Sequence, residues 1–402
     1  MDFALSDEVL ELRERLRAFM VEHVVPREAE LTRAIDDEVA PGIAYPAAIC
    51  ELRAGARAEG LWNLWLANHH EGPGLTNVAY GVLCEEMGRA LYVAPAIFNC
   101  SFPDTGNAEA LLDYGTPDQI ERFARPLLED DVRSCFALTE PEAASSDPTN
   151  IFTTARLEDG EWVLDGHKWW ISGAAGASFA IVMAVTDPDA PPHARASMLI
   201  VPVETEGYEL VRALPLLGHA RGYGHAELRF HGVRIPAQNV LGGRGEGFAV
   251  AQARLGPGRI HHCMRAIGGA ERAFELMCRR ANERVTRGET LADKQMVKDW
   301  VARSRIEIDT ARLSVLHAAW TIDTVGKKAA RQEIAEIKVQ VAQMLCDVVD
   351  RAIQVHGALG LSDDTPLVGL YRMGRALRLG DGPDEVHKLT IARRELARFP
   401  AA

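Results

Sequence analysis

Residues 378–388, RLGDGPDEVHK, place three carboxylates and a histidine in one short stretch between two basic, leucine-rich segments. The carboxylates are Asp381, Asp384 and Glu385, and the histidine is His387. Such a group could bind a metal ion, or its members could act as a general acid and a general base. The glycine and proline in the middle predict a turn, and acidic side chains favour the first turn of a helix. We therefore expect Asp384 and Glu385 mainly to start the next helix, and His387 to pack or face solvent.

Other chemical motifs are absent from the sequence. The glycine-rich segment 241–248 lacks the G-x-G-x-x-G spacing of a dinucleotide-binding turn, so we expect a loop. There is no Walker A sequence and no G-x-S-x-G nucleophile elbow. The histidine pairs 69/70 and 261/262 have no partner at metal-ligand spacing, which predicts ordinary surface or core histidines and no metal site.

The elements that must position these residues follow the order helical, β, helical. Residues 1–133 have helical texture, and Thr116-Pro-Asp-Gln119 has the capping hydroxyl, first-turn proline and third-position glutamine of a helix start. Residues 134–240 contain short branched and aromatic segments separated by turns, which predicts an antiparallel β-domain. Residues 241–402 return to helical spacing, with long helices expected over 262–283, 293–325 and from 334 to a stop at Gly357.

The composition favours a soluble, cytoplasmic protein with no nucleic-acid partner. Its 402 residues are 47% hydrophobic, and the net charge of −13 disfavours a polyanion. Seven cysteines form no C-x-x-C pair, and the odd number argues against a disulfide framework. The opening MDFALSDEVLELRERL is unlike a signal peptide, and no run approaches the roughly 20 apolar residues of a membrane helix.

Two long blocks carry more information than any generic motif, namely Cys135-Phe-Ala-Leu-Thr-Glu-Pro-Glu-Ala-Ala-Ser-Ser-Asp-Pro-Thr-Asn-Ile151 and Gly166-His-Lys-Trp-Trp-Ile-Ser-Gly173. With Phe230-x-x-Val-Arg-Ile-Pro236 and Gln354-Val-His-Gly-Ala358, they resemble the acyl-CoA dehydrogenase family in order and approximate spacing. Gly60-Leu-Trp-Asn-Leu64, Pro103-Asp-Thr-Gly-Asn107 and the 377–387 stretch look like the branch that is fused in animals to a kinase-like domain, which this sequence lacks.

The resemblance implies an α+β flavoprotein with a helical amino-terminal domain (1–133), a middle β-domain (134–240) and a carboxy-terminal four-helix bundle (241–402). FAD would lie between the β-domain and the bundle. The implied reaction oxidises the Cα–Cβ bond of an acyl-CoA to a trans-2-enoyl-CoA, by α-proton abstraction and β-hydride transfer to flavin N5. Electrons would pass to an electron-transferring flavoprotein, and the family's assembly implies a homo-oligomer, a dimer or a tetramer.

The same resemblance assigns roles by position in the β-domain. Trp170 and Ser172 match the aromatic wall and the hydroxyl beside flavin N5, whereas Trp169 is expected to pack because neighbours on a strand face opposite ways. Ser145 or Ser146 matches a serine that contacts the phosphopantetheine, and the choice stays open because this block is one residue longer than the common form. The remaining positions, which line the flavin, are Phe136, Leu138 and Thr139.

Other positions match cofactor or substrate contacts in the helical bundle. Arg259 matches an arginine near the active site and CoA, and Arg393 is also placed with the substrate. A second group matches residues that hold the FAD diphosphate and adenosine of the neighbouring subunit, namely Arg284, Thr286 and Gln295. A turn near the adenosine matches Gln354, Gly357 and Ala358, and flavin contact is the alternative reading for Pro383 and Glu385.

The resemblance makes Asp381 the catalytic base, because Asp381-Gly382 stands where the family carries glutamate-glycine and the position used by other branches is Gly258. Gly382 would admit the substrate, and the amide of residue 381 would help to polarise the thioester carbonyl. Aspartate is one methylene shorter than glutamate, so its reach should be shorter. The alternatives are a flavin oxidase of the same fold acting on a non-CoA or unusual substrate and, further away, a non-catalytic relative that binds a macromolecule.

Overall fold

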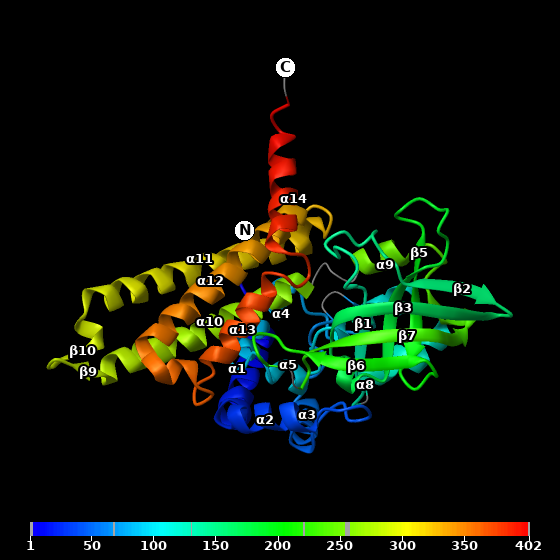
Figure 1. The fold of residues 1–402 in the computed structure, drawn as a ribbon. Helices are drawn as coiled ribbons and strands as arrows, with labels where there is room; N and C mark the ends of the chain where they lie inside the picture. Colours follow the sequence, from blue (N-terminus) through cyan, green and yellow to red (C-terminus); the bar gives the residue numbers. More distant parts are fainter. Residues whose placement is uncertain (1–2, 67–68, 130, 220–221, 254–257, 401–402) are drawn as a thin grey trace. The chain divides into compact units, whose positions relative to one another are not determined.

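The computed structural model describes residues 3–66, 69–129, 131–219, 222–253 and 258–400. The chain forms two compact units, which we describe separately (Figure 1). The first, here called the bundle unit, contains Met1–Ala29, Glu59–Pro95 and Gly256–Ala402. The second, the sheet unit, contains Glu30–Ala58 and Ala96–Leu255. The helical amino-terminal range therefore contributes residues to both units.

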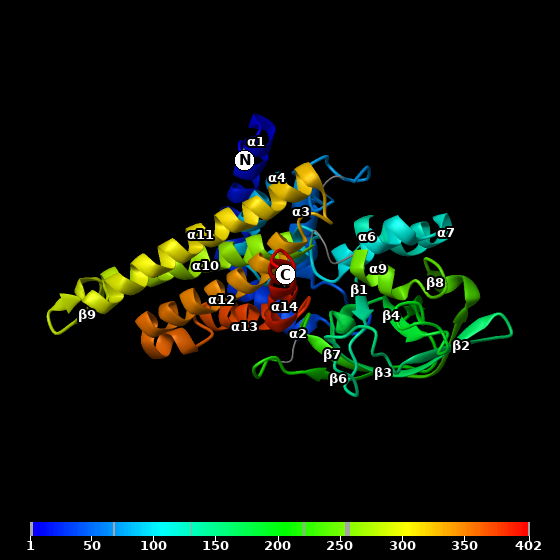
Figure 2. The same cartoon turned by 90° about the horizontal axis from the view of Figure 1, so that it is seen from above.

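The bundle unit is built on long helices with apolar faces. Figures 1 and 2 show α10, α11 and α12 lying side by side, with the β9–β10 hairpin at one end. The elements are α1 (Asp7–Phe19), α4 (Asn77–Gly88), α10 (Gly258–Glu283), β9 (Val285–Thr286), β10 (Glu289–Thr290), α11 (Gln295–Val325), α12 (Arg331–His356), α13 (Leu367–Leu377) and α14 (Asp384–Leu396). Within the described residues, no helix combines the length and the apolar character needed to cross a bilayer.

The helix starts and stops follow the expected chemistry. The helix predicted from residue 334 is α12, and Gly357 ends it with a φ of +67°, a left-handed conformation that glycine adopts without a Cβ penalty. Helices α4 and α10 approach each other closely at Gly268. Only glycine fits there, since a Cβ would lie 2.0 Å from the carbonyl oxygen of Glu85. The long helices predicted over 262–283 and 293–325 are confirmed as α10 and α11.

The sheet unit is one eight-stranded sheet with helices on one face. Its order is β6-β7-β3-β2-β4-β5-β8, with β1 added beside β4. All pairs are antiparallel except β1–β4 and β2–β4, which are parallel. The strands are β1 (Ser134–Ala137), β2 (Thr154–Glu158), β3 (Glu161–Ser172), β4 (Phe179–Val185), β5 (Ala196–Pro202), β6 (Tyr208–Leu214), β7 (His225–Pro236) and β8 (Val240–Leu241).

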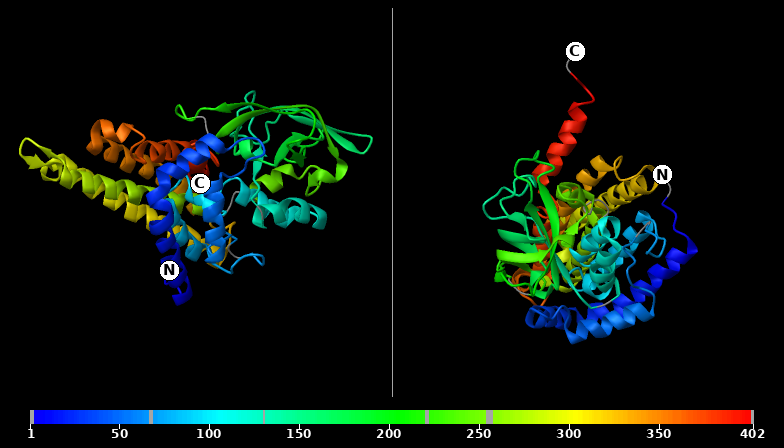
Figure 3. Two further views of the ribbon diagram at one scale, coloured as in Figure 1. Left: turned by 90° about the horizontal axis from the view of Figure 1, so that it is seen from below. Right: turned by 90° about the vertical axis from the view of Figure 1, so that its right-hand side faces the viewer.

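Helices α6 and α9 lie on the same face of this sheet (Figures 2 and 3). The helices of the unit are α3 (Ala47–Ala58), α6 (Asp104–Tyr114), α7 (Pro117–Gln119), α8 (Arg125–Glu129) and α9 (Gly247–Ala253), while α2 (Glu28–Glu38) and α5 (Ala94–Ile97) begin in one unit and end in the other. The predicted capping box is confirmed, since Gln119 N donates to Thr116 Oγ1 at 3.3 Å and Thr116 N to Gln119 Oε1 at 3.1 Å. The helical, β, helical order predicted from the sequence is confirmed.

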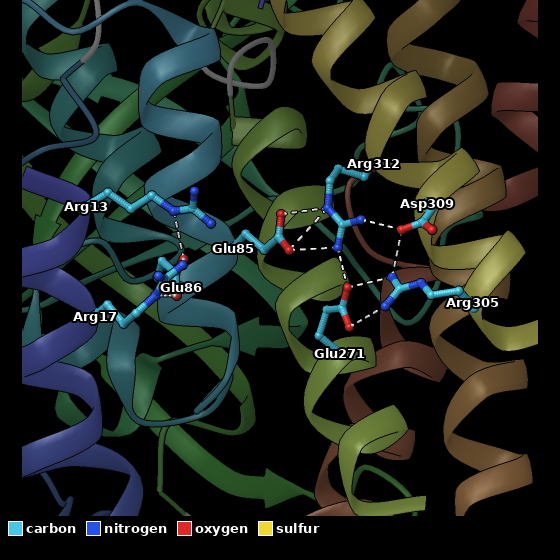
Figure 4. A network of polar contacts seen from close by, with 8 residues as sticks. All are labelled: Arg13, Arg17, Glu85, Glu86, Glu271, Arg305, Asp309 and Arg312. Atoms are coloured by element: carbon cyan, nitrogen blue, oxygen red, sulfur yellow. Dashed lines mark hydrogen bonds and ion pairs between the residues drawn. The ribbon is translucent and has the colours of Figure 1, made fainter. Parts of the chain in front are cut away.

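Two adjacent glutamates on α4 form ion pairs with different neighbouring helices (Figure 4). Glu86 accepts hydrogen bonds from Arg13 Nε at 2.8 Å and Arg17 NH2 at 2.7 Å, both on α1. Glu85 instead binds Arg312 of α11, whose guanidinium also contacts Glu271 of α10. Burial raises the pKa of the Glu86 carboxyl, but the two arginines outweigh this effect and hold the pKa below its ordinary value.

Replacing Glu86 with glutamine should lower the free energy of unfolding by roughly 1–3 kcal/mol at pH 7, because the variant loses charge-assisted hydrogen bonds at a site where its side chain is 6% exposed. Because the pKa of Glu86 is lower in the folded state, its ionised carboxylate stabilises the protein at any pH above the ordinary carboxyl pKa. This stabilisation is lost as the pH falls through the folded-state pKa. Urea unfolding should therefore show the difference shrinking below about pH 4.

The matched control is Glu14→Gln, since Glu14 also binds Arg17 but its side chain is 65% exposed. Exposed pairs contribute little, so this variant should change stability by less than about 0.5 kcal/mol. Equal losses in the two variants would contradict the assignment of the stability to the buried pair.

Candidate active site

The turn between α13 and α14 is fixed through its backbone. Asp381 and Gly382 both have positive φ, +55° and +96°. Lys338 of α12 is buried, and its Nζ donates to the carbonyl oxygens of Leu377 and Gly380, each at 2.9 Å. These bonds satisfy the carbonyls of the last residue of α13 and of the residue before Asp381, where unpaired buried polar groups would be costly.

Two further donors meet at the carbonyl oxygen of Asp381. Arg259 NH2 of α10 and His387 Nε2 of α14 each lie 3.2 Å from it. Burial lowers the pKa of the Arg259 guanidinium, and the nearby Asp381 charge partly offsets this. The sequence-predicted pair Asp381 and Arg259 is therefore brought together in the structure.

The side chain of Asp381 is partly buried and faces a residue that sequence reasoning passed over. Its Oδ2 lies 3.5 Å from His262 Nε2, and the two side chains are 14% and 17% exposed. The prediction that both members of the 261/262 pair are ordinary histidines is incomplete. His261 does pack in the core, edge-on to Tyr80 with ring centroids 4.6 Å apart, but His262 faces the turn. The available signal was spacing, since Arg259 and His262 stand three residues apart and share a helix face.

The three carboxylates of the turn separate by role. Helix α14 begins at Asp384, so the expected helix start is confirmed, and Pro383 occupies the N-cap. The Asp384 carboxylate is buried and accepts a hydrogen bond from Arg378 Nε at 2.8 Å. Glu385 is exposed in the first turn. Among the described residues, no group of three or more potential ligands is arranged to hold a metal ion.

His387 is a packing and donating residue. Burial, with the charges of Arg259 and Lys338, lowers its pKa to about 4, so the ring is neutral near pH 7. A carbonyl can only accept, so the proton of the neutral ring lies on Nε2, facing Asp381 O. A Cβ on Gly382 would lie 2.9 Å from this nitrogen. Gly382 is therefore needed for the ring to reach the turn.

In the sheet unit, a buried ion pair holds the loop that follows β1. Lys168 of β3 donates to Glu140 Oε1 at 2.7 Å and to the carbonyl of Leu138 at 2.8 Å, and both charged side chains are almost fully buried. Glu140 also accepts from the backbone amides of Phe152 and Thr153 at 2.6 and 2.9 Å. Burial lowers the pKa of Lys168 to about 8, against the raising effect of Glu140.

This anchor places the hydroxyl of Thr139 and the tryptophans of β3 side by side. Trp169 N donates to Thr139 O at 3.1 Å, and Thr139 Oγ1 donates to Trp169 O. Because the hydroxyl proton of Thr139 is already donated to Trp169 O, the hydroxyl oxygen can only accept a hydrogen bond from a ligand. Phe136 on β1 and Leu138 in the loop are each half-buried nearby.

A register shift in β3 changes the expected alternation of the tryptophans. The pairing with β7 slips between Lys168 and Ile171, and Trp170 has a φ of +55° and is 39% exposed. Both indoles therefore lie in a bulge. In a regular strand, the side chains of these two neighbours would point to opposite faces of the sheet. Ser172 Oγ lies 2.9 Å from His225 Nδ1, and the His225 ring is 5.1 Å from that of Trp170. Sequence reasoning missed His225, whose pKa is lowered by burial.

The structure distinguishes the two candidate serines. Ser145 Oγ accepts from Glu140 N at 3.0 Å, which makes it part of the loop's own bonding. Ser146 is exposed. Ser145 therefore helps to hold the loop, whereas the side chain of Ser146 is accessible to solvent.

The residues matched to the FAD diphosphate and adenosine lie at the other end of the bundle unit. Helix α10 has 26 residues, which at about 1.5 Å per residue makes it roughly 39 Å long. Arg259 is near its start, whereas three exposed residues follow its end: Arg284, Thr286 and Gln295. The end of α12 lies at this same end of the bundle (Figures 1 and 2), carrying Gln354, Gly357 and Ala358. Arg393 is exposed near the end of α14 and about 13 Å by helical rise from Asp384.

Comparison with known proteins gives one family over most of the chain. The acyl-CoA dehydrogenase amino-terminal, middle and carboxy-terminal domain models match residues 6–131, 135–233 and 245–396. The chain is 50% identical to the Mycobacterium tuberculosis protein named Probable acyl-CoA dehydrogenase FadE2, over 99% of this chain and 98% of that protein. A structure from Mycobacterium abscessus assigned as an acyl-CoA dehydrogenase is 45% identical with a TM-score of 0.93, covering 99% of this chain and 100% of that one.

Human acyl-CoA dehydrogenase family member 11 is a longer relative. It is 42% identical over 95% of this chain, which spans 49% of the human protein. The similarity to the animal branch noted in the sequence is therefore confirmed, and this chain corresponds to about half of that relative.

A Gly382→Ala substitution should destabilise the protein by roughly 1–3 kcal/mol, because the new Cβ meets His387 and the backbone conformation is unfavourable for alanine. Chemical unfolding of the purified protein measures this. Gly380→Ala is the control, since a Cβ there would make an ordinary 3.6 Å contact with Ala376 O and should change stability by less than about 0.5 kcal/mol. Similar losses at both positions would contradict the role given to the His387 contact.

Proposed function

The chain belongs to the acyl-CoA dehydrogenase family of FAD-dependent oxidoreductases that act on CH–CH bonds, and we propose that it converts an acyl-CoA to the trans-2-enoyl-CoA with Asp381 as the base. The observation that carries the proposal is the turn itself. Its backbone is held by Lys338, Arg259 and His387, while the Asp381 carboxylate is partly buried at the family's base position.

The residues present fit a flavin. An isoalloxazine ring needs a flat apolar face and hydrogen-bonding groups at its edge, and the sheet unit offers the half-exposed indole of Trp170 beside the hydroxyls of Thr139 and Ser172. We propose that these residues, with Phe136 and Leu138, hold the ring. FAD, when bound, supplies the acceptor for the hydride that leaves Cβ.

The chain's own share of the chemistry is placement and proton abstraction. Asp381 takes the α-proton, and desolvation by the substrate strengthens it as a base. The amide of residue 381 polarises the thioester carbonyl, which stabilises negative charge that develops on the oxygen. Arg259 holds the Asp381 backbone and supplies a positive charge near the CoA, while Ser146 is exposed and suited to contact the phosphopantetheine.

We propose an electron-transferring flavoprotein as the acceptor and medium to long acyl-CoAs, including branched or 4-hydroxylated ones, as substrates. The first rests on family membership and the second on the 42% identity to the animal branch. The seven cysteines all carry free thiols, which is consistent with the cytoplasm as its compartment.

Asp381→Asn should retain FAD but slow the bleaching of the flavin by acyl-CoA by about 10²–10⁴-fold, because the amide cannot accept the proton. Stopped-flow absorbance with a panel of acyl-CoAs measures the rate and identifies the preferred chain. Asp384→Asn is the control, since Asp384 serves Arg378 and helix α14, and it should bleach normally while unfolding at a lower temperature. Normal bleaching by Asp381→Asn would refute the assigned base.

The fate of the reduced enzyme separates dehydrogenase from oxidase. A dehydrogenase should stay bleached in air and regain colour with an electron-transferring flavoprotein. Rapid recovery in air alone would instead support an oxidase of the same fold.

We further propose that Arg284, Thr286 and Gln295 complete the FAD site of a neighbouring subunit in a dimer or tetramer. Support comes from the length of α10, because Arg284 follows its end, roughly 38 Å by helical rise from Arg259, which contacts Asp381 of the same chain. Their exposure, together with the 60% and 62% exposure of Val285 and Met296, fits a surface that a second chain covers.

Mixed oligomers test this arrangement. Co-expressed Asp381→Asn and Arg284→Ala chains, each with little activity alone, should form hybrid dimers that recover activity at one of two sites. That site takes its aspartate from one chain and its arginine from the other. If hybrids isolated with two affinity tags showed no recovery while each parent kept its fold, the shared site would be excluded.

A further inference from the structure

We propose that His262 is a positioning residue for Asp381, held by Arg265 as the tautomer that carries its proton on Nε2. Two successive contacts connect Arg265 and His262 of α10 to Asp381 of the turn. Arg265 NH2 lies 3.2 Å from His262 Nδ1, and His262 Nε2 lies 3.5 Å from Asp381 Oδ2. The inference rests on the proposed role of Asp381 as the base.

The tautomer follows from the chemistry of the guanidinium. Arginine can only donate hydrogen bonds, so His262 Nδ1 must accept from Arg265. A neutral imidazole has one proton, which is then on Nε2, the nitrogen that faces the carboxylate. Adding a second proton would displace the bond from Arg265 and place two positive charges together. His262 therefore presents a neutral N–H donor to Asp381.

A hydrogen-bond donor at the position of His262 orients the Asp381 carboxylate, which the bonds to the Asp381 backbone do not orient. Arg259 and His387 fix the Asp381 carbonyl, but the carboxylate direction depends on the side-chain torsions. A contact of 3.5 Å is longer than an ordinary hydrogen bond, and catalytic hydrogen bonds are commonly longer before substrate binds. Once it shortens, Oδ2 is directed to His262 and Oδ1 to the α-proton. Aspartate has a shorter side chain than glutamate, so the direction of its carboxylate matters more for reaching the α-proton.

His262 is not assigned a share in moving the proton. The α C–H bond breaks, its proton passes to Asp381 Oδ1, and the electron pair stays on the substrate. His262 already carries a proton on Nε2, and its Nδ1 accepts from Arg265, so the ring has no vacant nitrogen for the abstracted proton. Arg259, Lys338 and His387 also face the turn, where each donates to a backbone carbonyl oxygen, and Arg378 binds Asp384.

Two substitutions separate positioning from packing. His262→Phe keeps a ring but removes both interactions, and should slow flavin reduction by acyl-CoA about 10–100-fold while changing the KM by less than about threefold. His262→Gln should recover most of the rate, because its amide oxygen can accept from Arg265 and its NH2 can donate to Asp381. His317→Phe is the control, since His317 stacks on Trp320 in α11, and it should reduce normally.

A spectroscopic measurement tests the tautomer without turnover. Nitrogen NMR of the FAD-loaded enzyme with ¹⁵N-labelled histidine should show a neutral His262 ring with its proton on Nε2. Arg265→Met should shift that ring toward a mixture of tautomers. A proton on Nδ1 in the unsubstituted enzyme would overturn the proposal.

The outcomes also separate this inference from the proposed function. If Asp381→Asn abolishes reduction but His262→Phe reduces at the normal rate, the base stands and the positioning role fails. If Asp381→Asn reduces normally, the base assignment itself fails. If Phe and Gln at position 262 lose rate equally with FAD content and melting temperature unchanged, the donor role is wrong.

Discussion

The need to satisfy inward-facing carbonyls with side-chain donors determines the geometry of the turn between α13 and α14. The carbonyl oxygens of Leu377, Gly380 and Asp381 all accept hydrogen bonds from side chains, and Asp381 and Gly382 are consecutive left-handed residues. Lys338 comes from α12 and Arg259 from α10, so the turn is held by helices distant in sequence. A carboxylate on this turn is placed by the packing of the whole bundle unit, which is why the site depends on helices that carry no reacting group.

The sheet unit uses the same principle with a complete ion pair. Glu140 and Lys168 are buried against each other, and their remaining hydrogen-bonding capacity is used by the Leu138 carbonyl and by backbone amides. Leaving one partner alone would strand a charge in the core, so the pair fixes the loop to β3. The residues that we propose to hold the flavin are then attached to this anchored loop and strand, with Trp170 exposed in a bulge of β3.

The length of α10 links the chemistry to assembly. A helix of 26 residues sets Arg259 and Arg284 at opposite ends, and this separation is the basis of our proposal that Arg284 serves the cofactor site of a second chain. On α4, Glu85 forms an ion pair with Arg312 of α11 and Glu86 forms one with Arg13 of α1, so this helix is bound to both neighbours.

The sequence by itself determined the order of elements, the helix stops, the capping box at Thr116 and the family, because these depend on local spacing and on contiguous blocks. It also made Asp381 the candidate base, since the turn motif is contiguous. Only the tertiary structure decided that His262 faces this aspartate and that the tryptophans of β3 lie in a bulge. His262 and Asp381 are 119 residues apart, and contacts at such separation depend on how helices pack, which no local pattern encodes.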